Sequence, residues 1–148
     1  MRENEVYQLI MAFKRKYPKT VAWRLRKHCA VLAMHLDPDE KILYAFTGQK
    51  NDNPLDFTNT NAIVLTDRRL IMACKRLVFG YFLTSITPDM YNDMEVAGGI
   101  IWGTLTIDTV KEVVVLSDIQ KEAMPEIENT ISEYMENAKK QYEDKDSE

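Results

Sequence analysis

The chain has 148 residues, a formal net charge of −4 and hydrophobic residues at 45% of its positions. This length is typical of one globular domain with an extension. No run of about 18 apolar residues is present, so the sequence predicts no membrane-spanning helix. The apolar run at residues 9–13 is too short for the core of a signal peptide, and the cytoplasm is the expected location. Cys29 and Cys74 are expected to be buried free thiols.

Residues 1–37 are expected to form a basic helical hairpin. Apolar residues recur at helical spacing over residues 6–17, Pro18 interrupts the pattern, and a second series runs over residues 21–36. Residues 6–36 contain seven basic side chains and no acidic one, although the whole chain is acidic. These basic residues are Lys14, Arg15, Lys16, Lys19, Arg24, Arg26 and Lys27. Such charge asymmetry between segments indicates that the basic segment contacts an acidic part of its own chain or an anionic partner.

Seven segments further along have the length and composition of β-strands. The central ones lie between Asn61 and Leu83, where the turns are too short to hold a helix. Gly80 inside this stretch suggests a bend or bulge, and Gly98-Gly99 between apolar runs predicts a hairpin. The expected strands are residues 42–48, 61–66, 69–74, 77–85, 91–97, 100–107 and 111–117. The three central strands carry apolar residues on both faces, as in a small closed barrel or a sheet covered by other elements.

An amphipathic helix is expected to follow the last strand. Its apolar stripe consists of Ile119, Ala123, Ile127, Ile131, Met135 and Ala138, at intervals of three or four residues. Pro125 must lie near the first turn, so the first well-formed turn is expected to begin between Lys121 and Met124. The charged residues 138–148 lack apolar periodicity and are expected to form a disordered tail.

Four motifs in this order and spacing resemble the bacterial PH-like domain family, of the YokE type. They are Leu43-Tyr-Ala-Phe-Thr-Gly48, Val64-Leu-Thr-Asp-Arg-Arg-Leu70, Leu77-Val-Phe-Gly-Tyr81 and Ile107-Asp-Thr-Val-Lys-Glu112. The resemblance spans roughly residues 40–137. It implies a mainly β fold (α+β by content): a seven-stranded antiparallel, partly open barrel over residues 38–137, capped by the C-terminal helix and preceded by the helical extension. It implies little about activity, because PH-like barrels host unrelated functions.

Three interpretations of the basic segment remain open. It packs on the acidic remainder of its own chain or of a second copy, or it contacts an anionic membrane, where each Lys or Arg contributes about 1 kcal/mol. In the membrane case Trp23 and Phe13 would sit at the level of the lipid headgroups. The third partner is nucleic acid, which the negative overall charge and the lack of a basic platform with interleaved aromatic residues make the weakest choice.

A specific phosphoinositide site is not expected. Lipid-binding PH domains place several basic residues between their first two strands, whereas this loop has Lys50 against Asp52 and Asp56. Lys75 and Arg76, between the third and fourth strands, are candidates for contacting an anion.

No catalytic site, metal site or cofactor is expected. His28 and His35 lie about two helical turns apart, which favours solvated or helix-end positions over shared metal ligation. The acidic residues Asp89, Asp93 and Glu95 lack the spacing of a calcium loop. No glycine-rich phosphate loop, nucleophile elbow or zinc pattern is present.

The sequence therefore favours a non-catalytic, cytoplasmic interaction module. It is expected to bind protein partners and to form a homo-oligomer, through an edge strand or the groove beside the C-terminal helix. The alternative is peripheral membrane association through the basic N-terminal helices. The residues expected to contact a partner or an anion are Lys14, Arg15, Lys16, Lys19, Arg24, Arg26, Lys27, Lys75 and Arg76.

Overall fold

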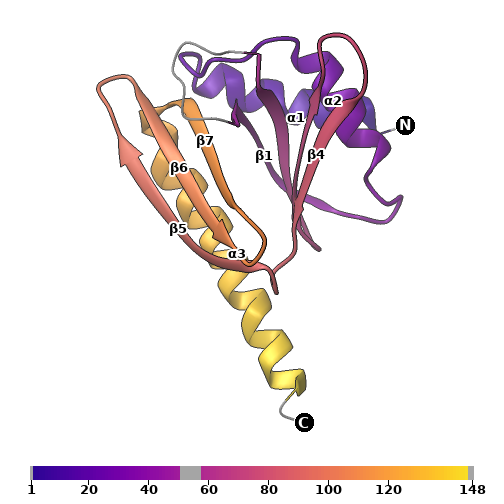
Figure 1. Ribbon diagram of the computed structural model, residues 1–148, viewed down its shortest axis with the longest axis vertical. Helices are drawn as coiled ribbons and strands as arrows, with labels where there is room; N and C mark the ends of the chain where they lie inside the picture. The colour runs from indigo at the N-terminus through magenta and orange to yellow at the C-terminus, as the bar shows by residue number, and fades with distance from the viewer. Residues whose placement is uncertain (1, 51–57, 147–148) are drawn as a thin grey trace.

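The computed structural model describes residues 2–50 and 58–146, which form a seven-stranded antiparallel sheet with helices on both of its faces (Figure 1). The helices are α1 (Glu3–Lys16), α2 (Leu25–Met34), the short 3₁₀ helix η1 (Lys121–Ala123) and α3 (Met124–Asp146). The strands are β1 (Ile42–Gln49), β2 (Thr60–Thr66), β3 (Leu70–Lys75), β4 (Tyr81–Ile86), β5 (Tyr91–Gly98), β6 (Trp102–Thr109) and β7 (Val113–Gln120). No helix among the described residues is long and apolar enough to cross a bilayer.

The strands form a half-open barrel. Their order is β4-β3-β2-β1-β7-β6-β5, and β1 joins β7 through a single residue pair, Gln49 with Ser117. The sheet therefore divides into two halves that diverge from this joint, and β4 and β5 lie at its two ends (Figure 1). This arrangement confirms the PH-like barrel that the sequence predicted.

The main core lies between the two halves of the sheet and α3. Phe46 of β1, Ile63 of β2 and Met72 of β3 point into it, and Ile127 and Ile131 of α3 close it. All five side chains are fully buried. The apolar stripe predicted for the last helix therefore caps the barrel interior.

A second core lies on the outer face of β1–β3. Alternate residues of the strands, Ala62, Val64, Ile71 and Ala73 among them, point outward. The α1–α2 hairpin covers them with Val6, Ile10, Cys29, Val31, Leu32 and Leu36. The central strands are apolar on both faces because α3 covers one face and the hairpin covers the other. Cys29 and Cys74 are buried and not disulfide-bonded, as expected.

The fourth strand begins later than predicted. It starts at Tyr81, and residues 77–80 form a turn in which Gly80 has a φ of 77°. The prediction of a strand over residues 77–85 was therefore wrong for residues 77–80. Glycine adopts positive φ without steric cost, so Gly80 ends the turn rather than bending a strand.

The last helix begins where predicted and ends later. Pro125 is its second residue, where its missing N–H costs little. The helix continues to Asp146, so the prediction that the tail is disordered from residue 138 was wrong. Residues 138–146 are rich in Ala, Lys, Gln and Glu, which favour helix without needing an apolar stripe. Residues 147–148 lie outside the described residues.

Candidate interaction surfaces

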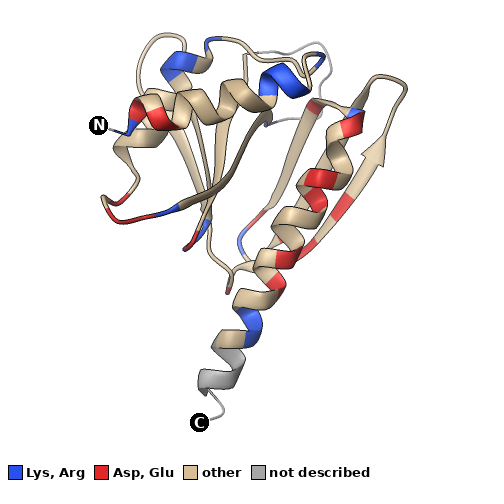
Figure 2. Cartoon of the chain, turned by 180° about the vertical axis from the view of Figure 1, so that it is seen from behind, with Lys and Arg blue, Asp and Glu red and all other residues tan. Residues whose placement is uncertain are grey.

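The basic residues singled out from the sequence gather at one end of the molecule. α1 ends and α2 begins at this end, and Figure 2 shows the Lys and Arg residues of these two helix termini as separate groups along it. Lys75 and Arg76 join them because β3 ends beside the start of α2. We call this the basic end and define it by residues 14–27, the β3–β4 turn (residues 75–80) and the β5–β6 turn (residues 99–101).

Segment 17–24 ties the strand ends together here. The amide of Val21 donates to the carbonyl of Asp118 at 2.9 Å, and the side chain of Gln49 donates to the carbonyl of Val21 at 3.0 Å. The amide of Trp23 donates to Oγ1 of Thr60 at 3.1 Å. The hairpin is therefore fastened to β7, β1 and β2 through backbone groups.

Ion pairing contributes little to the docking of the hairpin. Of the nine candidate residues, Lys16 alone forms an ion pair within the described part of the chain, with Glu126 of α3 at 2.6 Å. Glu126 also accepts hydrogen bonds from Tyr44 at 2.6 Å and Tyr17 at 3.2 Å. Burial raises the pKa of Glu126, but the bonds from Lys16 and Tyr44 outweigh it and lower the pKa below its usual value. The expected contact between the basic hairpin and the acidic helix is thus one cluster within a single chain, and apolar packing does most of the docking.

The β3–β4 turn exposes a group of apolar side chains at the basic end. Leu77, Val78 and Phe79 are 59%, 74% and 81% exposed. The guanidinium of Arg76 lies 5.2 Å from the centre of the half-exposed Phe82 ring. A shallow groove of about 320 Å³ runs beside the turn. Sequence analysis missed this surface because it assigned these residues to a strand, although Gly80 was a signal for a turn.

The two histidines have structural positions. His28 is buried, contrary to the expectation of a solvated or helix-end residue, and its Nδ1 accepts a hydrogen bond from the amide of Lys75 at 2.8 Å. Its Nε2 lies 2.9 Å from the carbonyl of Trp23. Burial lowers the pKa of His28 to about 4, so the ring is neutral at pH 7. His35 follows the last residue of α2, and its Nε2 lies 3.0 Å from the hydroxyl of Tyr81.

The opposite end of the molecule contains a buried ion pair. Glu40 is buried and binds Arg69 at 2.9 Å and Oγ1 of Thr66 at 2.6 Å. Burial alone would raise the pKa of Glu40, but the hydrogen bonds from Arg69 and Thr66 outweigh it and hold the pKa at about 2. This carboxylate is fully engaged in holding the start of β1 against β2 and β3.

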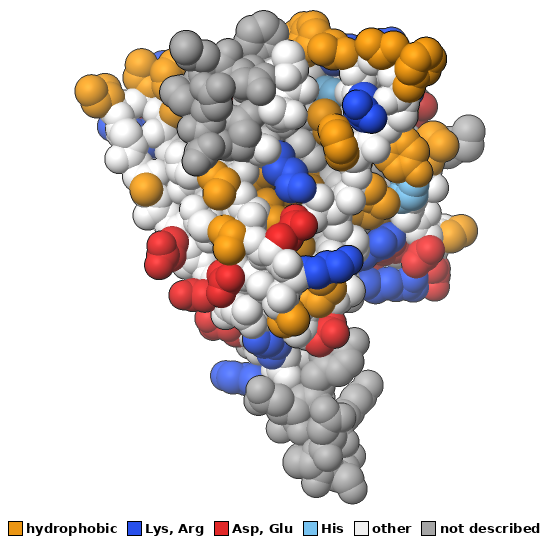
Figure 3. All heavy atoms as spheres, in the orientation of Figure 1, with side chains coloured by type: hydrophobic (Ala, Val, Ile, Leu, Met, Phe, Trp, Pro, Cys, Tyr) orange, Lys and Arg blue, Asp and Glu red, His pale blue; other side chains and the backbone are white. Residues whose placement is uncertain are grey.

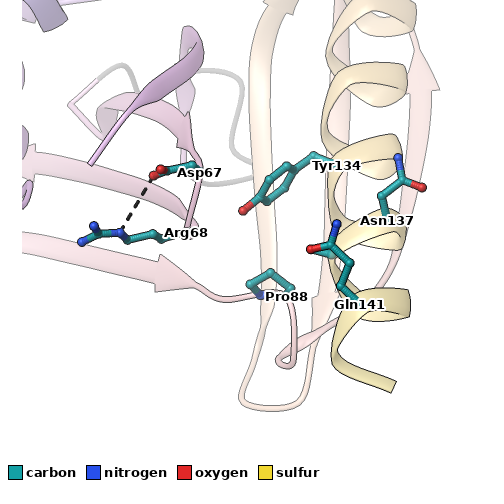
Figure 4. A pocket seen from close by; sticks show the side chains of 7 residues that line it. Asp67, Arg68, Pro88, Tyr134, Asn137 and Gln141 are labelled. Atoms are coloured by element: carbon teal, nitrogen blue, oxygen red, sulfur yellow. Dashed lines mark ion pairs between the residues drawn. The ribbon is translucent and has the colours of Figure 1, made fainter. Parts of the chain in front are cut away.

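The groove beside α3 lies at this same end. It has a volume of about 410 Å³, and Tyr134 and Gln141 face Arg68 and Pro88 across it (Figure 4). The residues that line it are Asp67, Arg68, Pro88, Tyr134, Asn137, Ala138 and Gln141. Arg68 is already paired with Asp37 and Asp39 at 2.8 Å each, so the groove offers no unpaired cation to an anionic ligand.

The two edge strands differ in charge. β5 carries Asp93 and Glu95, whereas β4 carries no charged residue. Charged side chains on an edge strand discourage another strand from pairing with it. β4 is therefore the less protected edge of this sheet, and it exposes Tyr81, Phe82 and Leu83.

Within residues 2–50 and 58–146, no three His, Cys, Asp or Glu side chains converge in a way that could hold a metal ion.

Comparison with protein families agrees with the architecture. Residues 36–133 match the model of the family described as bacterial PH domain, and no curated protein matches the chain. The matched region covers all seven strands and the first part of α3, whereas α1 and α2 precede it. The match does not extend to the YokE type that the motifs suggested. Members of this family are binding modules. Because the match spans well over half of the chain, this chain belongs to the bacterial PH domain family.

Proposed function

We propose that this chain is a non-catalytic interaction module that binds an extended segment of another protein chain along β4. A second copy of the same chain is the partner that fits best. The observation that carries the proposal is an edge strand with exposed apolar side chains and no charge.

The edge of β4 is available for pairing. Within the described residues, β4 pairs only with β3, through the register Leu70–Ile86 to Lys75–Tyr81. An edge strand carries unpaired N–H and C=O groups, and a partner strand that adds to it satisfies them. The exposed side chains of Tyr81, Phe82 and Leu83 would add apolar contact area beside these hydrogen bonds.

A second copy suits this edge on grounds of charge. An isologous contact places a strand antiparallel to its own copy, so a charged residue near the two-fold axis would lie close to the same charge in the partner. Pairing through β5 would bring Asp93 and Glu95 against their counterparts, whereas β4 has no such cost. Antiparallel pairing of β4 would also bring the basic turn at Arg76 toward the turn after β4 in the partner, where Asp89 is exposed.

The space beside β4 also favours an added segment. A groove of about 100 Å³ follows the second half of the strand, between it and the β6–β7 turn. Leu83 and Ile86 line one side, and Thr109 and Glu112 line the other. A partner strand could place one side chain in this groove, which would fix its register.

The N-terminal helices fit the alternative, an amphipathic membrane anchor, poorly. Such an anchor needs a free apolar face. The apolar faces of α1 and α2 are buried against β1–β3. Phe13, expected near the lipid headgroups, belongs to the main core and is only 5% exposed. Membrane contact through these helices would therefore require the hairpin to leave the sheet.

The contact along β4 can be tested by introducing one charged residue on each edge strand of the sheet. Leu83→Lys places a charge on β4, and Ala97→Lys places the same charge on an exposed position of β5 as the matched control. We expect the wild-type chain and Ala97→Lys to form dimers at increasing concentration and Leu83→Lys to remain monomeric. Light scattering measures the mass, and circular dichroism establishes that both variants are folded.

Two results would contradict the proposal. A wild-type chain that stays monomeric at every concentration would show that self-association is wrong. A dimer that forms equally well in Leu83→Lys and in the wild type would show that the contact does not use β4.

A further inference from the structure

The basic end carries exposed apolar side chains on three separate projections. The β3–β4 turn and the β5–β6 turn lie at the same end of the barrel (Figure 1), and hydrophobic side chains mark both sides of that end (Figure 3). Segment 17–24 lies between the strand ends and contributes Trp23. The exposed residues are Trp23, Leu77, Val78, Phe79, Ile100, Ile101 and Trp102, with exposed fractions between 38% and 90%.

Hydrogen bonds join these projections into one surface. The indole nitrogen of Trp102 donates to the carbonyl of Lys19 at 2.7 Å. His28 connects the carbonyl of Trp23 to the amide of Lys75, where the β3–β4 turn begins. The three apolar projections are therefore held in place relative to one another by the folded chain.

Positive charge surrounds the apolar side chains. Besides the basic residues of α1 and α2, the basic residues near the tips of the turns are Lys19, Arg24, Lys75, Arg76 and Lys121. Among the described residues there, Glu122 is the exposed acidic one. Asp118, beside Val21, is buried. Asp52 and Asp56 belong to the β1–β2 connection, which lies outside the described residues. At the opposite end, Asp37, Asp39 and Asp67 lie within ion-pair distance of Arg68.

We propose that the basic end rests on an anionic bilayer, with the tips of the β3–β4 and β5–β6 turns inserted among the lipid headgroups. Apolar side chains on convex turns fit a soft interface better than a flat protein surface, because each tip can enter the bilayer separately. Trp23 and Trp102 would lie at the headgroup level, where indole rings are favoured. The basic side chains would contact anionic headgroups without a defined site for any single one.

The inference goes beyond the proposed protein contact and does not depend on it. Bilayer contact uses the end of the barrel, whereas strand addition uses the side of the sheet at β4. In an antiparallel pair the two basic ends would point in opposite directions, so only one of them could face a given bilayer.

The chain reports on this contact without a label. It contains two tryptophans, and both lie at the basic end. We expect the full chain to co-sediment with phosphatidylcholine vesicles containing about 30% phosphatidylserine and not with phosphatidylcholine alone. Binding should shift the tryptophan emission to shorter wavelength, and added salt should reverse both signals.

Matched variants at the two ends test the location. Val78→Ser/Phe79→Ser removes the apolar tip, and Val110→Ser/Val113→Ser removes two similarly exposed side chains around the β6–β7 turn as the control. We expect the first pair to lower vesicle affinity at least about tenfold and the control pair to leave it unchanged. Arg76→Gln should lower the affinity about fivefold, and the control Lys111→Gln should not. All four positions in the tip and control pairs are more than half exposed, so these variants should fold.

The proposal is overturned if the wild-type chain fails to bind anionic vesicles. It is also overturned if binding is unaffected by the tip variant or is weakened equally by its control. If the tip variant instead changes the mass of the protein in solution and no vesicle binding occurs, the apolar tips serve a protein contact.

Discussion

His28 links the N-terminal hairpin to the barrel through both nitrogens of its ring. Nδ1 accepts from the amide of Lys75, so the proton lies on Nε2 and is donated to the carbonyl of Trp23. If Nδ1 were protonated, it and the amide of Lys75 would be two hydrogen-bond donors facing each other, and the ring would carry a positive charge in a buried site. The fold therefore requires the neutral ring.

The stability of the protein should depend on the titration of His28. The pKa of His28 is about 4 in the folded chain and near 6.5 in the unfolded chain, so the unfolded chain binds the proton first as the pH falls. The stabilisation is nearly complete above about pH 6.5 and is lost progressively as the pH falls toward 4, by about 2 kcal/mol between pH 7 and pH 5. Urea unfolding at pH 7 and pH 5 measures the loss.

A variant isolates this contribution from the carboxylates. His28→Gln removes the titrating group, and we expect its free energy of unfolding to change less between pH 7 and pH 5 than that of the wild type. His35→Gln is the control and should retain the wild-type difference. An unchanged pH dependence in His28→Gln would mean that other groups cause it.

At the scale of elements, the position of α3 depends on a close approach to β6. A Cβ atom added at Gly103 would lie 2.6 Å from Cγ and 2.8 Å from Sδ of Met124, the first residue of α3. Gly98 lies next to it across the β5–β6 ladder, and no described atom lies within 4 Å of the Cβ that it lacks. The two glycines thus differ in what surrounds them.

This difference predicts unequal effects of the same substitution. Gly103→Ala should destabilise the protein by about 1–3 kcal/mol, because Met124 must move and the start of α3 with it. Gly98→Ala should change the free energy of unfolding by less than about 0.5 kcal/mol. Thermal unfolding of both variants provides the comparison, and equal effects would refute the role assigned to the contact.

At the scale of the whole molecule, the hairpin and the barrel depend on each other. The outward-facing residues of β2 and β3, such as Ala62, Val64 and Ile71, are fully buried only because α1 and α2 cover them. Exposing such a continuous apolar face favours aggregation. A chain that lacks the hairpin is therefore unsuited to testing self-association.

Truncations at the two ends of the chain should affect folding differently. Removing residues 1–36 should produce aggregation or loss of cooperative unfolding. Removing residues 140–148 should leave a soluble, folded protein, because Met135 is fully buried whereas the side chains described after it in α3 are at least partly exposed. Gel filtration and thermal unfolding distinguish these outcomes, and a soluble, cooperatively folded 37–148 chain would show that the barrel is independent.

The parts that could be predicted from sequence are those with a clear period. Side chains along β1–β3 point alternately to the two faces of the sheet, and Ile127 and Ile131 recur at helical spacing. Both patterns follow from the local geometry of strands and helices. Leu77–Phe79 could not be assigned in this way, because an apolar run looks the same in a strand and in an exposed turn. The convergence of the basic residues of the hairpin with Lys75 and Arg76 depends on how α2 packs on β3, which no local pattern records.

The sequence by itself determined which segments become strands and helices, that the central strands need a cover on both faces, and that the N-terminal segment is basic. Only the tertiary structure decided which element provides each cover, that β4 pairs with β3 alone among the described strands, and that apolar turns and positive charge meet at one end. The reason is physical: secondary structure follows from the periodicity of neighbouring residues, whereas exposure depends on which distant segments pack against a surface and which leave it uncovered.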